Sequence, residues 1–144
     1  MRAAVLAFLL IGLLSGCVGK QDISAAEALI TKFRALEAKG DFAAIYDLGS
    51  PDFKKAAKED DFLQMMTSLQ RKTQGCGAPT RIGWQTYSGT GGTKITETFQ
   101  RACPRGPFNE TITVLMKDET ALLQGYNVAS PLLMMPDPPQ DQPI

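Results

Sequence analysis

The hydrophobic pattern of this 144-residue chain changes at Gly75, and that change limits its fold more than any other feature. Before Gly75, apolar residues recur at helical spacing. After it, apolar residues alternate with threonine and other polar residues, which is typical of half-buried strands. We expect strands at 81–88, 94–103, 108–117 and 121–129. Helices followed by such strands predict an α+β domain with its N-terminal helices packed on a curved antiparallel four-stranded sheet, cone-shaped in outline.

Capping residues set the expected ends of the helices. Ser24 and Glu27 have the spacing of a capping box, so we expect the first helix to begin at Ser24. Gly40 is placed to end it. After two short helical segments, a longer helix is expected over 59–74, where an acidic start and a basic end both suit the helix dipole.

The amino-terminal segment has the layout of a secretory signal. Arg2 precedes an apolar run over 3–14, which is shorter than the roughly 20 residues that a membrane span needs. The run ends in Leu14-Ser15-Gly16-Cys17, which resembles the bacterial lipobox. The resemblance implies cleavage before Cys17 and a diacylglycerol thioether on its sulfur, so that the membrane is a partner through the lipid. The alternative is an ordinary signal peptide with an incidental cysteine.

The residue after the cysteine bears on the location. In enterobacterial lipoproteins an aspartate there directs retention in the inner membrane, and this chain has Val18. The resemblance therefore implies the bacterial cell envelope, at the outer membrane facing the periplasm in a Gram-negative host. The expected organisation is a signal peptide at 1–16, a tether at 17–23, one domain at 24–130 and a Pro-rich tail at 131–144.

The tail itself has two parts. Residues 132–135 form an apolar quartet, Leu-Leu-Met-Met, which we expect to cover the open end of the cone; the alternative is a docking segment. The nine residues from Pro136 onward are expected to be extended and mobile, because proline cannot join a helix interior or a strand ladder.

Two cysteines remain besides Cys17. In an oxidising compartment, an even pair predicts a disulfide between Cys76 and Cys103, and two free thiols are the alternative. Neither residue belongs to a CxxC pair, so no metal site is predicted. The 15 basic and 15 acidic residues balance and form no basic run, which argues against nucleic acid as a partner.

Three short stretches carry a family pattern. They are Ala38-Lys39-Gly40-Asp41-Phe42 leading to Tyr46, Ser50-Pro51-Asp52-Phe53-Lys54, and the final hairpin from Thr113 to Glu119 with Gly125-Tyr126. With the order of the elements, this pattern resembles the cone-shaped, cystatin-like fold of nuclear transport factor 2 and its relatives. It is more specifically similar to a bacterial envelope family of unknown function.

The absence of histidine removes Ser-His-Asp and Cys-His nucleophile systems, and no cofactor is predicted. Some enzymes of the resembled superfamily place an aspartate and tyrosines inside the cone. The resemblance makes Tyr46, Asp47, Tyr87 and Tyr126 the corresponding candidates, with buried core tyrosines as the simpler interpretation. Trp84 shares strand parity with Ile82 and is expected in the core, with a ligand platform as the alternative.

Two functions follow from these patterns. We expect a lipid-anchored envelope protein with a non-catalytic domain that binds a small apolar ligand or another envelope protein. The alternative is an isomerase or dehydratase that uses Asp47 and a tyrosine in the cone cavity.

Overall fold

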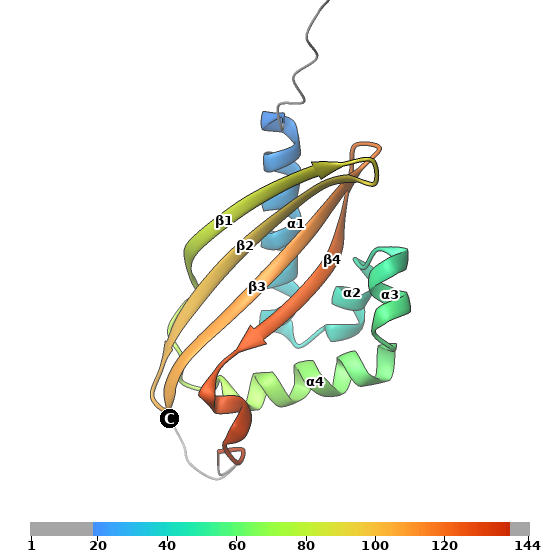
Figure 1. The fold of residues 1–144 in the computed structure, drawn as a ribbon. Coiled ribbons are helices and arrows are strands. Elements are labelled where there is room, and N and C mark those ends of the chain that lie inside the picture. The colour runs from blue at the N-terminus through green and yellow to red at the C-terminus, as the bar shows by residue number, and fades with distance from the viewer. Residues whose placement is uncertain (1–18, 139–144) are drawn as a thin grey trace, which may run out of the picture.

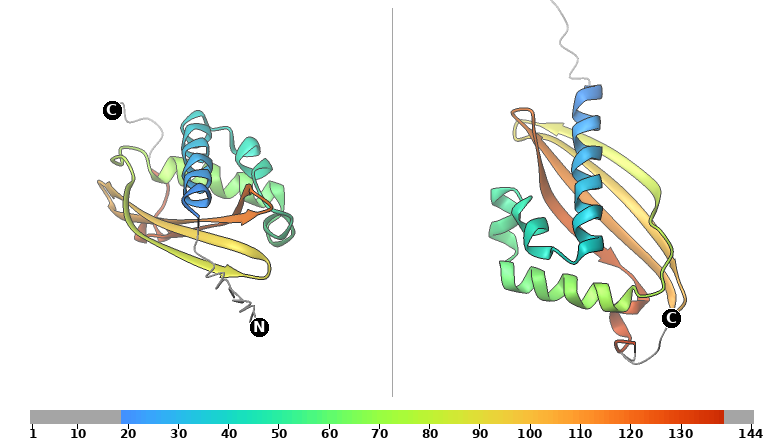
Figure 2. Two further views of the ribbon diagram at one scale, coloured as in Figure 1. Left: turned by 90° about the horizontal axis from the view of Figure 1, so that it is seen from above. Right: turned by 180° about the vertical axis from the view of Figure 1, so that it is seen from behind.

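The computed structural model describes residues 19–138, and it confirms the α+β prediction (Figure 1). The elements are α1 (Lys20–Lys39), α2 (Phe42–Asp47), α3 (Pro51–Ala56), α4 (Glu59–Lys72), β1 (Thr80–Gly89), β2 (Gly92–Cys103), β3 (Gly106–Lys117), β4 (Thr120–Ala129) and the 3₁₀ helix η1 (Pro131–Met134). The strands form one antiparallel sheet in the order β1-β2-β3-β4. Helices α1, α2, α3 and α4 all lie on one side of this curved sheet (Figure 2).

The first helix begins earlier than the capping box predicted. α1 starts at Lys20 with Gly19 as its N-cap, and the carbonyl oxygen of Gly19 accepts hydrogen bonds from the amides of Asp22 and Ile23. The prediction for Ser24 was wrong because the backbone is already helical when the chain reaches it. The expected tether over 17–23 is therefore mostly helical from Lys20 onward, while Cys17 and the signal segment lie outside the described residues.

The helices do not cover the sheet evenly. α1 packs across β3 and β4, and α2 and α3 lie beside β4 (Figure 1). The core between these layers contains Phe33 and Ile45 from the helices and Phe108, Ile112 and Leu123 from the strands. In contrast, most residues of β1 are exposed. Because the cover is uneven, the β1 side of the sheet is left exposed to other contacts.

The predicted disulfide is confirmed. Cys76, in the loop after α4, is bonded to Cys103 at the end of β2, with 4.1 Å between their Cα atoms. Cross-linking here attaches α4 and the loop after it to the sheet. Within residues 19–138, no helix is both long enough and apolar enough to cross a bilayer.

The C-terminal segment is attached to the domain further than expected. Leu132 of η1 is fully buried against the core, which agrees with a covering role for the apolar quartet, whereas Met134 points to solvent. The prediction of a free chain from Pro136 was wrong at Asp137, whose carboxylate lies 2.9 Å from Arg71 and 3.0 Å from Lys72. Hydrogen bonds from these two side chains of α4 lower the pKa of the Asp137 carboxyl group, and Lys72 makes the larger contribution. Residues 139–144 lie outside the described range.

Candidate functional site

The aspartate and tyrosine of α2 do not form a catalytic pair. Tyr46 is buried, and its hydroxyl donates a hydrogen bond to the carbonyl oxygen of Ala57 at 2.9 Å. The side chain of Asp47 is 80% exposed, and its nearest cation is Lys54 at 3.8 Å. Neighbouring residues on a helix point in different directions, so one enters the core and the other faces water. Tyr46 is therefore a core tyrosine, as the simpler interpretation held.

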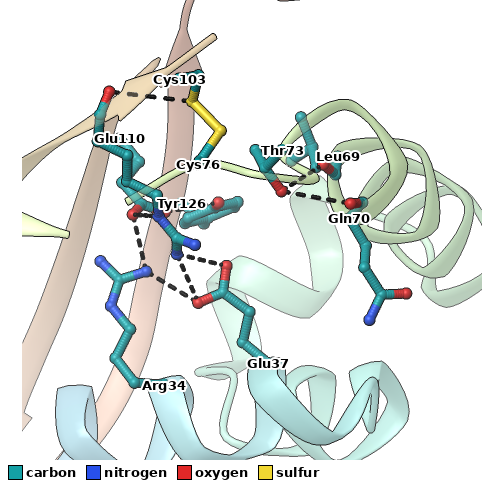
Figure 3. Close-up of polar contacts among 10 residues, drawn as sticks. Arg34, Glu37, Leu69, Gln70, Thr73, Cys76, Cys103, Glu110 and Tyr126 are labelled. Carbon is teal, nitrogen blue, oxygen red and sulfur yellow. Dashed lines mark hydrogen bonds and ion pairs between the residues drawn. A yellow bond between two sulfur atoms is a disulfide. The ribbon is translucent and has the colours of Figure 1, made fainter. Parts of the chain in front are cut away.

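Tyr126 does contact a carboxylate, but one that the sequence analysis did not name. Its hydroxyl donates to Oε2 of Glu110 at 2.9 Å (Figure 3). The Glu110 side chain is completely buried; its Oε1 accepts a hydrogen bond from Arg101 Nε at 3.1 Å and forms an ion pair with Arg34 Nη1 at 2.8 Å. Two hydrogen-bond donors and a second arginine thus compensate this carboxylate, which is the condition for a buried charge to persist.

Glu37 completes a cluster of two arginines and two glutamates, hereafter the charge cluster. Its carboxylate lies 3.0 Å from Arg34 and 2.8 Å from Arg101, so each arginine is shared between Glu37 and Glu110 (Figure 3). Burial alone would lower the pKa of Arg101, but the charges of Glu110 and Glu37 outweigh burial and raise it. The pKa of Tyr126 lies well above its ordinary value, first because of burial and then because of the charge on Glu110. The charges of the cluster sum to zero.

The charge cluster forms part of a cleft of about 370 Å³ between α1, α4 and the sheet. Phe42, Met66 and Leu69 line its apolar side, and all three are already buried in the core. Among the described residues, Nη2 of Arg34 has no hydrogen-bond partner; the guanidinium lies over the Phe99 ring, 4.7 Å from its centroid. The guanidinium groups are already engaged by carboxylates or an aromatic ring, so this cleft offers a ligand little free charge.

A second buried glutamate lies nearer the open side of the sheet. Glu97 on β2 is 4% exposed, and its only polar side-chain contact among the described residues is with Arg81 Nη1 at 3.3 Å. Arg81 also reaches Glu27 of α1 at 3.4 Å, and the carboxylate of Glu97 is the main reason that the pKa of Arg81 is raised. These residues line a hollow of about 470 Å³ between α1 and the first two strands, with Ile30 and Phe99 as its apolar part.

Trp84 stands beside this hollow and not in the core. It pairs directly with Glu97 across β1 and β2, so the two side chains share the inner face of the sheet. Trp84 is nevertheless 58% exposed. The core prediction was wrong because α1 packs mainly on β3 and β4 and leaves the Trp84 side chain uncovered. Strand parity indicated the correct face but could not show whether a helix covers it.

Tyr87 lies on the opposite face of the same strand. It pairs with Lys94, on the outer side of the sheet, and is 70% exposed. The five predicted cavity residues are therefore not brought together: Tyr46 and Tyr126 are buried in different places, Asp47 faces water, and Trp84 and Tyr87 flank an exposed strand. No shared cavity contains them.

The outer edge of β1 is open, whereas that of β4 is bridged at Leu123. On β4, the amide of Leu123 donates to the carbonyl oxygen of Leu48, and the amide of Ser50 donates to that of Leu123, both at 2.8 Å. No strand or loop of residues 19–138 pairs with β1 on the side away from β2. A long edge strand with unpaired backbone groups is a ready template for another chain.

The two buried glutamates had a recognisable signal. Glu97 falls between Ile95 and Phe99 in the alternation of β2, and Glu110 falls between Phe108 and Ile112 in that of β3. A charged residue in phase with buried apolar ones predicts a buried ion pair, since a lone buried charge is too costly.

Comparison with protein-family models and with curated protein sequences finds no match to this chain.

Proposed function

We propose that this chain is a lipid-anchored protein of the bacterial cell envelope whose α+β domain binds another protein through β1 and performs no catalysis. The anchor is inferred from the pattern that ends in Leu14-Ser15-Gly16-Cys17. The observation that carries the binding function is the open edge of β1, which presents Ile82, Trp84 and Tyr87 to solvent. Large exposed side chains on an unpaired strand favour a role in protein recognition.

The isomerase or dehydratase alternative has weaker support. A general base must reach its substrate and be free to accept a proton. The Asp47 side chain is exposed, and Glu110 is buried with two arginines and the Tyr126 hydroxyl on its oxygens. Binding of a small apolar ligand is likewise less favoured, because the cleft beside the charge cluster is partly charged and its apolar side chains are already packed.

Lipid attachment is tested by substitution of the cysteine. Cells grown with a clickable palmitate analogue should label the wild-type protein and leave Cys17→Ser unlabelled, because serine cannot form the thioether. The wild-type protein should also sediment with membranes after a salt wash. Equal labelling of the two proteins would contradict the anchor.

Protein binding through β1 is tested by site-specific photo-cross-linking in intact cells. A photoreactive phenylalanine analogue replaces Tyr87, which is exposed and lies outside the core. The matched control carries the same analogue at Lys55, which is exposed on α3. We expect a defined protein adduct from position 87 and none from position 55. Absence of any adduct from positions 82, 84 and 87 would contradict the proposal.

A further inference from the structure

We infer that β1 receives an extended segment of a partner protein as a fifth strand, and that a lysine or arginine of this segment places its charge between Trp84 and Glu97. The inference rests on the proposed protein-binding function and adds the binding mode and the chemistry of the partner. Four features of β1 and its surroundings support it, namely the backbone at the edge, the lack of protective residues, the charge of the hollow and the exposed ring of Trp84.

The backbone of β1 presents alternate residues to the open edge. Gly89 and Gly92 flank a two-residue turn and pair with each other, so they form a hydrogen-bonded pair at the end of the hairpin. Counting back along the antiparallel ladder, Ser88, Thr86 and Trp84 occupy non-hydrogen-bonded positions toward β2. Their N–H and C=O groups therefore point away from β2, where an added strand can pair with them.

The edge lacks most of the devices that usually block such pairing. Residues 82–88, Ile-Gly-Trp-Gln-Thr-Tyr-Ser, contain no charged residue and no proline. Native edge strands are commonly protected by lysine, proline, bulges or a covering element. β1 has one irregularity, between Arg81 and Gly83, which leaves the regular ladder from Gly83 to Gly89 available. That length suits a partner segment of five to seven residues.

The hollow beside this edge has an excess of negative charge. Two carboxylates, Glu27 and Glu97, share the guanidinium of Arg81, whose side chain is 48% exposed. Arg34 also lines this hollow, but Glu37 and Glu110 balance its charge within the charge cluster. The carboxylate charge of Glu110, in contrast, is fully compensated by contacts to two arginines and one tyrosine. A cationic side chain from a fifth strand would supply a second cation to Glu97, whose own side chain is only 6% exposed.

Trp84 adds a reason for a cation at this position. Its side chain lies on the inner face directly across from Glu97, and more than half of it is exposed. A strand added beside Trp84 projects alternate side chains onto the same face. An ammonium or guanidinium group placed there can contact both the indole ring and the carboxylate, since aromatic faces attract cations.

A second copy of this chain is a less suitable occupant. Antiparallel pairing of two β1 strands requires a two-fold axis perpendicular to the sheet, which reverses the direction of the strands and of α1 beside them in the second copy (Figure 1). The start of α1 lies near the turns that end β1 and β3, since Asp22, Gly91 and Lys117 line the same surface hollow (Figure 1). The two amino termini would then leave opposite ends of the pair. Two lipid anchors in one membrane favour a common side, so we infer a different protein.

The experiment is a selection from a displayed library of random twelve-residue peptides, with the purified full-length mature chain in detergent as the target. The test variant is Thr86→Pro, which removes one outward N–H group and leaves the ladder to β2 paired. Thr86→Ala is the matched control, since it retains that N–H group. Thermal unfolding of both variants establishes that the domain remains folded.

We expect the enriched peptides to alternate apolar residues and to carry lysine or arginine at one fixed position. They should bind the wild-type chain and Thr86→Ala alike and bind Thr86→Pro at least tenfold more weakly. Glu97→Gln should reduce binding of a basic peptide by about tenfold, equivalent to about 1.4 kcal/mol. The same peptide with norleucine in place of the basic residue should bind Glu97→Gln and the wild type equally.

Four results would overturn the inference. They are a library without enrichment, enriched peptides without a basic residue, equal binding to Thr86→Pro, and light scattering that shows a wild-type dimer converted to a monomer by Thr86→Pro. The photo-cross-linking experiment separates this failure from that of the proposed function. An adduct between position 87 and another protein would preserve protein binding through β1 even if the fifth-strand mode were wrong.

Discussion

Each half of the sheet's inner face holds a buried glutamate, and the two carboxylates differ in how many partners compensate their charge. On β3, Glu110 is contacted by Arg34, Arg101 and Tyr126 beneath α1. On β2, the single ion pair of Glu97 within residues 19–138 is the longer contact to the half-exposed Arg81. The edges also differ, because Leu48 and Ser50 pair with Leu123 on the edge of β4, whereas no segment of residues 19–138 pairs with the outer edge of β1. The comparison separates a half that is covered by helices and buried from a half that is exposed, to which we assign the proposed binding role.

The position of α1 explains this difference. Phe33 of α1 packs against Tyr126 of β4, with 5.2 Å between the ring centroids, and Arg34 follows it into the charge cluster. A helix has a diameter of about 10 Å and adjacent strands lie about 4.8 Å apart, so one helix covers two or three strands. Once α1 is fixed over β3 and β4, it does not pack closely on β1 and reaches that strand through the contact between Glu27 and Arg81.

The largest contrast should come from neutralising each glutamate in turn. Glu110→Gln leaves Arg34 and Arg101 with one carboxylate between them in a buried site, and we expect a loss of about 3–5 kcal/mol in the free energy of unfolding. Glu97→Gln should cost about 1 kcal/mol or less, because Arg81 can turn to solvent. Urea unfolding of both variants measures the difference, and equal losses would remove the distinction between the two halves.

The next effect concerns Tyr126. Tyr126→Phe removes one donor from the Glu110 carboxylate and should cost about 1.5–3 kcal/mol, as for hydrogen bonds to charged groups. Because the pKa of Tyr126 is raised in the folded state, the stability from its neutral phenol is present below its ordinary value of 10.0 and is lost as the pH rises toward the folded pKa.

Unfolding measured at a series of pH values from about 8 to 11 tests this prediction. The wild-type chain should lose more stability above about pH 10 than Tyr126→Phe, and the gap between them should narrow. A constant gap over this range would contradict the raised pKa. Tyr87→Phe is the matched control, because that hydroxyl is exposed.

Loss of a hydroxyl should lower stability more at the bridged edge of β4 than at the open edge of β1. Ser50 is buried, accepts a hydrogen bond from the amide of Phe53 at 3.1 Å and donates to Gln124 on β4 at 2.7 Å. Ser50→Ala should therefore cost about 1–2 kcal/mol. Ser88→Ala on β1, where the hydroxyl contacts Thr93 at the surface, should change stability by about 0.5 kcal/mol or less. Chemical denaturation compares them, and a reversed order would contradict the prediction.

The smallest effect on the free energy of unfolding should come from substitution of Trp84. Trp84→Ala should change the free energy of unfolding by about 0.5 kcal/mol or less, since the ring is mostly exposed. Phe33→Ala, which opens a cavity under α1, should cost about 3–5 kcal/mol. Thermal unfolding compares the two variants. A large loss for Trp84→Ala would mean that β1 depends on this ring for its position.

Several parts of this protein could be predicted from its residues alone. Helical periodicity before Gly75 and alternation after it indicated the α+β order, because each pattern is compatible with one kind of secondary structure. The even pair Cys76 and Cys103 indicated the disulfide. The boundary at Ser24 failed because a capping signal competes with neighbouring residues that also favour helix, and the backbone at Gly19 began the helix first.

Only the tertiary structure decided which faces are covered and which charges meet. Strand parity placed Trp84, Glu97 and Glu110 on the inner face, but the same parity holds for a residue under a helix and for one in water. Arg34 and Glu110 are distant in sequence, and they meet because α1 crosses β3. Local patterns reflect the preferences of neighbouring residues, whereas the cover of each strand depends on the width of the sheet and the number of helices available to pack on it.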